Sequence, residues 1–214
     1  MVAVKICGLN DEDSVEAAVL GGAQMAGFVF FPKSPRAVTP ERAADLIRRV
    51  PASVLTVGLF VDPDDETLAR TLDATRLDLI QLHGEETPER TADIRHALGL
   101  PVMKAIAVET SADLERAEAY LDRVDRLLFD ARPPVGAPLP GGNARPFDWG
   151  LLKGRDWPLP WMLAGGLSLD NLAQAVRESG ARAVDVSSGV EDAPGRKNPE
   201  KIRAFLARAA TLEP

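Results

Sequence analysis

The chain contains one cysteine and two histidines, so few of its side chains could transfer protons near neutral pH. Cys7 follows the apolar run Val2–Ile6, and its thiolate could act as a nucleophile or as a general base. Asp130 follows Leu127–Phe129, where burial is expected to raise the pKa of the carboxyl and suit it to be a general acid. The two residues therefore indicate acid–base chemistry at the ends of two buried segments.

Each of these residues also has a purely structural interpretation. A lone cysteine is often an inert buried side chain, and Asp130 could instead pair with Arg132 or cap the next segment. His83 and His96 are too few and too scattered to predict a histidine metal site. We therefore expect no metal centre.

Two segments rich in small residues could bind an anion through their backbone. They cover residues 164–168, Ala-Gly-Gly-Leu-Ser, and residues 187–191, Ser-Ser-Gly-Val-Glu. Small side chains let backbone N–H groups approach a phosphate, although the same residues also serve as ordinary turns. Arg36 lies in a loop stiffened by Pro32 and Pro35, where it could clamp a carboxylate unless it is a solvated surface residue.

Composition excludes several classes of protein. The 214 residues are 45% hydrophobic and 27% charged, as in an ordinary globular chain, and a single cysteine cannot form an intramolecular disulfide. The net charge of −7 disfavours nucleic acid as a partner. No apolar run approaches the roughly 18–20 residues of a membrane span, and the N-terminus lacks a signal-peptide pattern. We expect a cytoplasmic protein that binds neither nucleic acid nor membrane.

Hydrophobic periodicity predicts eight strands, each followed by a helix. The strands are continuous apolar runs, which are typical of a parallel sheet covered by helices. They are expected at residues 2–6, 25–31, 54–61, 77–82, 102–107, 124–130, 160–164 and 183–186.

Capping residues predict where the helices begin. Asn10 and Ser111 are expected to be N-caps, and three further helices begin with a cap residue followed by Pro and Glu, at Thr39, Thr87 and Asn198. The remaining helices are expected after the acids of 62–65, near 147–153 and over 168–179, with a loop over 131–146.

Eight consecutive strand–helix units predict an α/β fold, a (β/α)8 TIM barrel that forms a single domain over residues 1–214. A doubly wound open sheet is the alternative. It is disfavoured because the turn after the first strand, Cys7-Gly8-Leu9-Asn10, lacks the GxGxxG pattern. In a barrel, the active site lies at the carboxyl ends of the strands, which is where Cys7 and Asp130 are expected.

The strand-end motifs together resemble one family, phosphoribosylanthranilate isomerase of tryptophan biosynthesis. The matching segments are KICGLN (5–10), GFVFFPKSPR (27–36), QLHGEE (81–86), FDWGLL (147–152), LAGGLSLDN (163–171) and VDVSSGVEDAPGRKN (184–198). The resemblance implies a cofactor-free barrel enzyme. Its reaction is the Amadori rearrangement of N-(5-phosphoribosyl)anthranilate to 1-(2-carboxyphenylamino)-1-deoxyribulose 5-phosphate.

The resemblance also implies residue roles. Cys7 would be the general base, Asp130 the general acid, and Arg36 the ligand of the substrate carboxylate. The phosphate-binding residues would be Gly165, Gly166, Ser187, Ser188 and Gly189, and further pocket residues would be Gln81, His83 and Asp185. The substrate would be a phosphorylated small molecule, with the protein acting as a monomer or a homodimer.

Three alternative functions remain open, and one segment differs from the family's usual sequence. A histidine-pathway aminoaldose isomerase is expected to carry a carboxylate at position 7, and an epimerase is expected to bind a metal. A non-catalytic ligand-binding barrel would not need both Cys7 and Asp130. The segment Gly141–Pro146 reads GGNARP, where the family usually has Gly-Gly-Ser/Thr-Gly, and predicts a stiffer loop with altered turnover.

Overall fold

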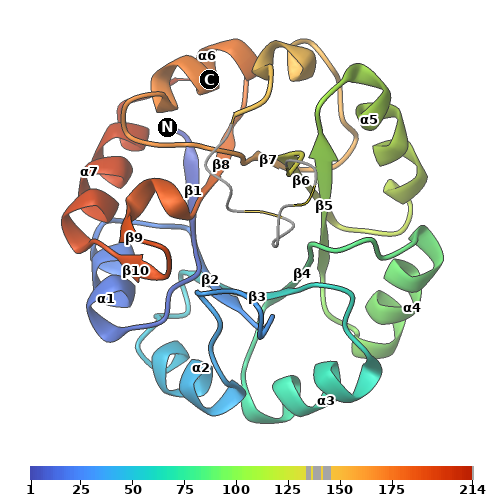
Figure 1. Ribbon diagram of the computed structural model, residues 1–214, viewed down its shortest axis with the longest axis vertical. Coiled ribbons are helices and arrows are strands. Elements are labelled where there is room, and N and C mark those ends of the chain that lie inside the picture. The colour runs from blue at the N-terminus through green and yellow to red at the C-terminus, as the bar shows by residue number, and fades with distance from the viewer. Residues whose placement is uncertain (134–135, 137–140, 142–145, 214) are drawn as a thin grey trace.

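In the computed structural model, eight parallel strands close into a barrel in which β8 pairs with β1 (Figure 1). The structure describes residues 1–133, 136, 141 and 146–213. The strands are β1 Ala3–Cys7, β2 Met25–Val29, β3 Leu55–Phe60, β4 Leu79–Leu82, β5 Val102–Val108, β6 Arg126–Ala131, β7 Trp161–Leu163 and β8 Ala183–Val186. The predicted (β/α)8 barrel is confirmed, and the open-sheet alternative is wrong.

Helices surround the barrel on its outer side (Figure 1). They are α1 Glu12–Leu20, α2 Pro40–Ile47, α3 Asp65–Ala74, α4 Pro88–Leu98, α5 Ser111–Arg116, α6 Leu172–Ser179 and α7 Pro199–Ala210. Short 3-10 helices cover Ala117–Tyr120, Trp149–Leu152 and Ser188–Val190. The helix expected near 147–153 is thus a 3-10 turn, and the one expected from residue 168 begins at Leu172.

Two of the predicted N-caps are wrong by one residue. Asp11, not Asn10, caps α1, because its Oδ1 accepts the N–H of Ser14 at 2.8 Å while Asn10 Nδ2 donates to the Gly195 carbonyl. Thr110, not Ser111, is the N-cap of α5. The three Pro-Glu starts are confirmed, with caps at Thr39, Thr87 and Asn198.

A short hairpin after β8 was not predicted. It consists of β9 Glu191–Ala193 and β10 Arg196–Lys197, which pair antiparallel. The turn passes through Gly195 at φ 78°, a conformation that favours glycine. The hairpin brings Glu191 and Lys197 beside each other on the barrel's loop face.

Side chains alternate between the inside and the outside of the barrel, as the pleat of a strand requires. A large outer core between strands and helices includes Ile6, Phe28 and Phe129. The inner core consists of Met25, Val57, Leu79, Met103, Ala105, Leu128, Met162 and Ala164. A separate small group, Cys7, Val29 and Leu59, lies at the carboxyl ends of β1 to β3. Side chains therefore fill the inside of the barrel, and the residues expected to do chemistry lie above them, at the carboxyl ends of the strands.

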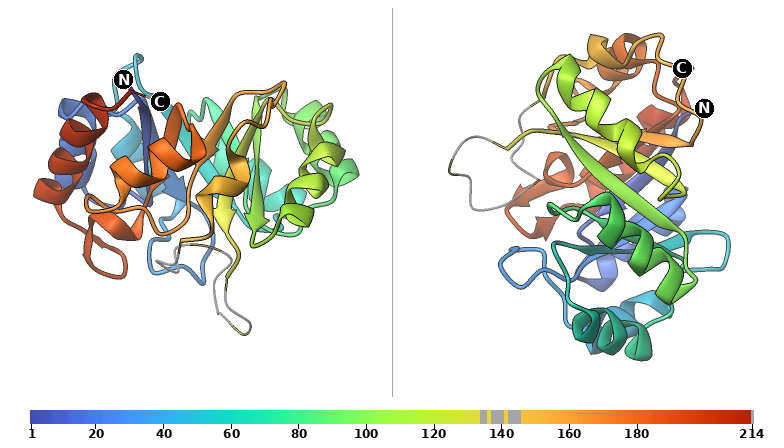
Figure 2. Two further views of the ribbon diagram at one scale, coloured as in Figure 1. Left: turned by 90° about the horizontal axis from the view of Figure 1, so that it is seen from above. Right: turned by 90° about the vertical axis from the view of Figure 1, so that its right-hand side faces the viewer.

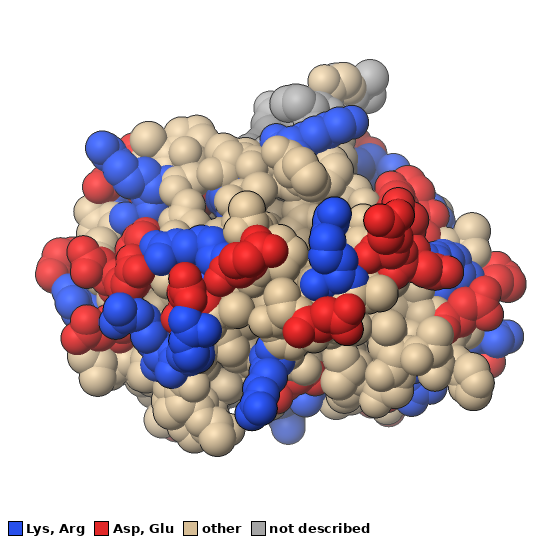
Figure 3. All heavy atoms as spheres, turned by 90° about the horizontal axis from the view of Figure 1, so that it is seen from below, with Lys and Arg blue, Asp and Glu red and all other residues tan. Residues whose placement is uncertain are grey.

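The first and last elements pack together and complete the ring. Helix α7 lies beside α1 (Figures 1 and 2), and the Val2 N–H donates to the Ala209 carbonyl. Figure 2 also shows the loop after β2 and the β9–β10 hairpin at the same end of the barrel. Basic and acidic side chains are interspersed on the face drawn in Figure 3. Within the described part of the chain, none of the helices is long and apolar enough to cross a membrane.

Candidate active site

A cavity of about 680 Å³, counting its open mouth, lies at the carboxyl ends of the barrel strands. Its lining includes Cys7, Arg36, His83, Asp130, Gly165, Gly166, Asp185, Ser187 and Ser188. The structure thus brings most of the predicted site residues, from across 180 residues of sequence, to one cavity.

Cys7 ends β1 and is only 4% exposed. Ser187 Oγ donates to the Cys7 carbonyl at 3.0 Å, which joins the end of β1 to the loop after β8. Burial raises the pKa of the Cys7 thiol above its ordinary value; Lys5 and Lys197 act to lower it, and Asp185 acts to raise it. Burial therefore opposes the thiolate, and two nearby lysines favour it.

Asp185 at the end of β8 forms a buried ion pair with Lys5 of β1. Lys5 Nζ donates to Asp185 Oδ1 at 2.9 Å, and the lysine side chain is 0% exposed. Burial lowers the pKa of Lys5, but Asp185 and Cys7 raise it above its ordinary value. The cavity wall therefore contains a carboxylate whose partner is a cation inside the barrel.

Asp130 at the end of β6 is held by hydrogen bonds on both carboxyl oxygens. Its Oδ2 lies 3.0 Å from His83 Nε2, and its Oδ1 accepts the Ala131 N–H at 2.8 Å. The alternative partner Arg132 instead pairs with Asp113 and Glu109. The carboxyl group therefore has one defined orientation toward the cavity.

Gln81 lies behind His83, is fully buried and is not among the residues that line the cavity. The β4 pleat turns it inward one layer below the loop that carries His83. Its Nε2 lies 2.9 Å from His83 Nδ1, and its Oε1 has no hydrogen-bond partner among the described residues. Gln81 thus orients the imidazole that contacts Asp130.

Gly141 lies directly against this pair. A Cβ built on Gly141 would lie 2.7 Å from His83 Nε2 and 2.8 Å from Asp130 Oδ2. A larger residue at this point would therefore require His83 and Asp130 to shift. Residues 142–145 of the segment Gly141–Pro146, on which the expected stiffening depends, lie outside the described residues.

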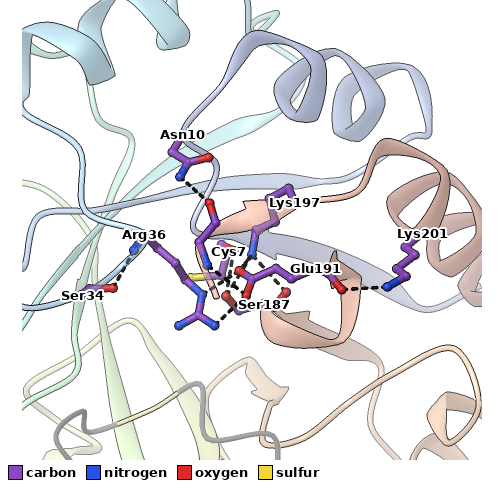
Figure 4. A network of polar contacts seen from close by, with 9 residues as sticks. Cys7, Asn10, Ser34, Arg36, Ser187, Glu191, Lys197 and Lys201 are labelled. Carbon is purple, nitrogen blue, oxygen red and sulfur yellow. Dashed lines mark hydrogen bonds and ion pairs between the residues drawn. The ribbon is translucent and has the colours of Figure 1, made fainter. Parts of the chain in front are cut away.

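Arg36 is buried, so the solvated-surface interpretation is wrong. Its Nε and Nη2 donate to the two carboxylate oxygens of Glu191 at 2.7 and 2.9 Å (Figure 4). Lys197 Nζ donates to Glu191 Oε1 at 2.7 Å. Burial acts to raise the pKa of Glu191, but Arg36 and Lys197 hold it below its ordinary value. Burial lowers the pKa of Lys197 despite its contact with Glu191.

The loops after β7 and β8 lie against each other at the cavity edge. Gly165 and Gly166 have φ angles of 89° and 63°, and a Cβ on Gly189 would overlap the Leu167 carbonyl. Within the described residues, the N–H groups of Gly166, Leu167 and Ser188 donate to no protein acceptor. These N–H groups are therefore free to bind an anion.

Three charged residues at the site were missed by the sequence reasoning: Lys5, Glu191 and Lys197. Lys5 had a signal, because a lysine inside the apolar run of residues 2–6 shares the inward face with Cys7. Glu191 and Lys197 are close only because the hairpin forms. Among the described residues, no group of three or more His, Cys, Asp and Glu side chains is placed to hold a metal ion.

Sequence comparison connects this geometry to known enzymes. A family model described as N-(5'phosphoribosyl)anthranilate (PRA) isomerase matches residues 4–208. The N-(5'-phosphoribosyl)anthranilate isomerase of Paramagnetospirillum magneticum is 62% identical over 208 residues, which cover 97% of each chain.

Structure comparison gives the same family. A phosphoribosylanthranilate isomerase in complex with reduced 1-(o-carboxyphenylamino)-1-deoxyribulose 5-phosphate is 37% identical, with a TM-score of 0.85 over 99% of this chain and 100% of the other. Monomers generated from the dimeric isomerase of Thermotoga maritima are also 37% identical, with a TM-score of 0.84 and the same coverage.

Proposed function

The chain belongs to the N-(5'-phosphoribosyl)anthranilate isomerase family, and from this membership we propose that Cys7 and Asp130 perform the proton transfers of its reaction. The activity is the isomerisation of N-(5'-phosphoribosyl)anthranilate to 1-(2-carboxyphenylamino)-1-deoxyribulose 5-phosphate, a step of tryptophan biosynthesis. The activity predicted from the motifs is confirmed, in preference to an epimerase or a non-catalytic barrel.

Asp130 acts as the general acid. Its protonated carboxyl donates to the furanose ring oxygen as the C1–O bond breaks, and the substrate nitrogen's lone pair forms the Schiff base. The hydrogen bonds to His83 and Ala131 support this assignment, because they orient the carboxyl in the cavity. The iminium then serves as the electron sink for the next step.

Cys7 acts as the general base. Its thiolate removes the proton from C2 of the sugar, and the electron pair of that C–H bond neutralises the iminium to give an enolamine. The enolamine tautomerises to the ketone, which completes the aldose-to-ketose change. The acid must start protonated and the base deprotonated, so the two environments must differ. The separate positions of Cys7 on β1 and Asp130 on β6 are consistent with this requirement.

Substrate binding is assigned to local groups, because a net charge of −7 would repel an anion at long range. Gly165, Gly166 and the segment Ser187–Gly189 hold the phosphate, and Arg36 holds the anthranilate carboxylate. Two Arg36 nitrogens already contact Glu191, so the substrate carboxylate would meet the remaining nitrogen or compete with Glu191. Asp185, whose Oδ1 contacts Lys5, would accept from a sugar hydroxyl.

The observation that carries this assignment is that Cys7 and Asp130, distant in sequence, line one cavity. The direct test is loss of the fluorescence of N-(5'-phosphoribosyl)anthranilate on addition of purified protein. Loss of the signal with formation of the ketose product supports the isomerase activity, and an unchanged signal contradicts it.

The oligomeric state and the cellular location are proposals as well. The ligand is a phosphorylated small molecule, and the protein is a monomer or a homodimer, as the dimeric Thermotoga maritima relative illustrates for its own chain. A cytoplasmic location is consistent with one unpaired cysteine in the sequence.

A further inference from the structure

Lys5 is a cation placed inside the apolar barrel. Its side chain is fully buried, and β1 pairs it with Met25 of the inner core. Removing an ammonium and a carboxylate from water is unfavourable, and apolar residues in place of a buried ion pair are often neutral or stabilising. The Lys5–Asp185 pair is therefore poorly explained by fold stability alone.

The strand geometry directs the Lys5 side chain toward Cys7. Residues two apart on a strand share a face, so Lys5 and Cys7 both point into the barrel. Cys7 pairs with Gly27 on β2, and a Cβ on Gly27 would lie 3.1 Å from Lys5 Cε, 3.3 Å from Lys5 Nζ and 3.2 Å from Cys7 Cα. The ammonium therefore reaches the level of Cys7 through the space that Gly27 leaves open.

Asp185 holds the ammonium at this level from the other side of β1. It is the β8 partner of Lys5 in the barrel register, and its Oδ1 accepts from Lys5 Nζ at 2.9 Å. Cys7 therefore lies close to a cation that cannot move away without breaking a buried ion pair.

Other charged groups surround Cys7, and Lys5, Arg36 and Lys197 all have carboxylate partners, but Lys5 is the one on the same face of the same strand as Cys7. Lys197 Nζ donates to Glu191 Oε1 and to the carbonyl and hydroxyl oxygens of Ser187. Arg36 is engaged by Glu191 through two hydrogen bonds. The groups that face the Cys7 region are Lys5 on β1, Arg36 after β2, His83 after β4, Asp130 on β6, Asp185 on β8, Glu191 on β9 and Lys197 on β10.

We propose that Lys5 is a positioning residue for catalysis, whose ammonium, held by Asp185, stabilises the thiolate form of Cys7. The proposal rests on the proposed function only in taking Cys7 as the base. It explains why a lysine lies inside the barrel and why residue 27 is a glycine. It also gives Asp185 a second task, because the same carboxylate that lines the cavity fixes the cation beside the base.

The test measures the ionisation of Cys7 directly. Because Cys7 is the only cysteine, its alkylation by iodoacetamide can be followed by mass spectrometry across a pH series in the full-length protein. The Lys5→Met variant is expected to be alkylated about tenfold more slowly at about pH 8, with its midpoint moved to higher pH. Asp185→Asn is expected to move the midpoint to lower pH, because the amide oxygen can still accept from Lys5 Nζ and hold it in place, while the negative charge that opposes the thiolate is lost.

Opposite shifts of the alkylation midpoint distinguish the proposal from simple loss of the ion pair. Loss of the pair alone would shift the midpoint in the same direction in both variants. Lys104→Met is the matched control, because Lys104 forms a comparable buried pair with Glu86 at 2.7 Å and faces another cavity. It is expected to leave the alkylation midpoint in place. If Lys5→Met does not fold, the double variant Lys5→Met/Asp185→Leu removes both charges, and its midpoint is expected above that of the wild type.

An unchanged midpoint in Lys5→Met or in the double variant, or shifts of both single variants in the same direction, would overturn the proposal. Failure of the proposed function has a separate signature. In that case Cys7→Ala would keep its turnover, whatever the alkylation series shows.

Discussion

Asp130 and Cys7 differ in how the protein restrains them. Both carboxyl oxygens of Asp130 have hydrogen-bond partners, so its orientation is set by direct contacts. Cys7 is restrained by packing and by the charges of Lys5, Lys197 and Asp185. At the scale of the residue, we therefore expect hydrogen-bond geometry to control proton donation by Asp130 and nearby charges to control the ionisation of Cys7.

Removing either proton-transfer group is expected to abolish most of the turnover. Cys7→Ala and Asp130→Asn should each lower kcat at least about a hundredfold, the scale of general acid–base catalysis. Steady-state kinetics with the fluorescent substrate measures this loss. Asp125→Asn is the control for Asp130, because Asp125 precedes β6 at the opposite end of the barrel. Near-normal kcat in either variant would remove that residue from the mechanism.

Replacing Arg36 tests the carboxylate site. Arg36→Met is expected to raise KM about tenfold or more with a smaller change in kcat, because it removes a charged hydrogen bond made to the bound substrate. Arg42→Met serves as the control, since Arg42 pairs with Glu12 outside the cavity. An unchanged KM in Arg36→Met would contradict the assignment.

At the scale of the element, two segments outside the strands contribute side-chain contacts to the site. The β9–β10 hairpin brings Glu191 against both Arg36 and Lys197, and Gly141 lies against the His83–Asp130 pair. Strands place residues at one level of the barrel, whereas the hairpin and Gly141 add contacts from outside the strands. The site is therefore completed by elements that follow β6 and β8.

Gly141→Ala tests the contact of its loop with the acid. The added methyl would overlap His83 Nε2 and Asp130 Oδ2, so we expect kcat to fall about tenfold while the fold persists. Gly150→Ala is the control, because Gly150 is exposed, has no positive φ and does not line the cavity. Equal kinetics for both variants would show that the contact has no catalytic effect.

At the scale of the whole molecule, closure of the barrel joins distant parts of the chain. β8 pairs with β1, and α7 packs beside α1. The C-terminal third therefore cannot unfold without exposing the first strand, and a single domain over residues 1–214 is expected.

Unfolding in urea tests the single-domain prediction. The three tryptophans, Trp149, Trp157 and Trp161, all lie after β6, so their fluorescence reports on the C-terminal third, whereas circular dichroism reports on all helices. One cooperative unit predicts coincident midpoints for the two signals. Separate midpoints would indicate that the two parts unfold independently.

The sequence by itself determined the order of the barrel strands and helices and most of the cap residues, and it predicts Cys7 as the base and Asp130 as the acid. These follow from local periodicity, from capping chemistry and from the rule that barrel chemistry lies at strand ends. Only the tertiary structure decided which groups meet. Lys5 pairs with Asp185, 180 residues away, and Arg36 with Glu191, 155 residues away, while Gln81 lies behind the cavity. Such pairings depend on the register with which the barrel closes, which no local pattern encodes.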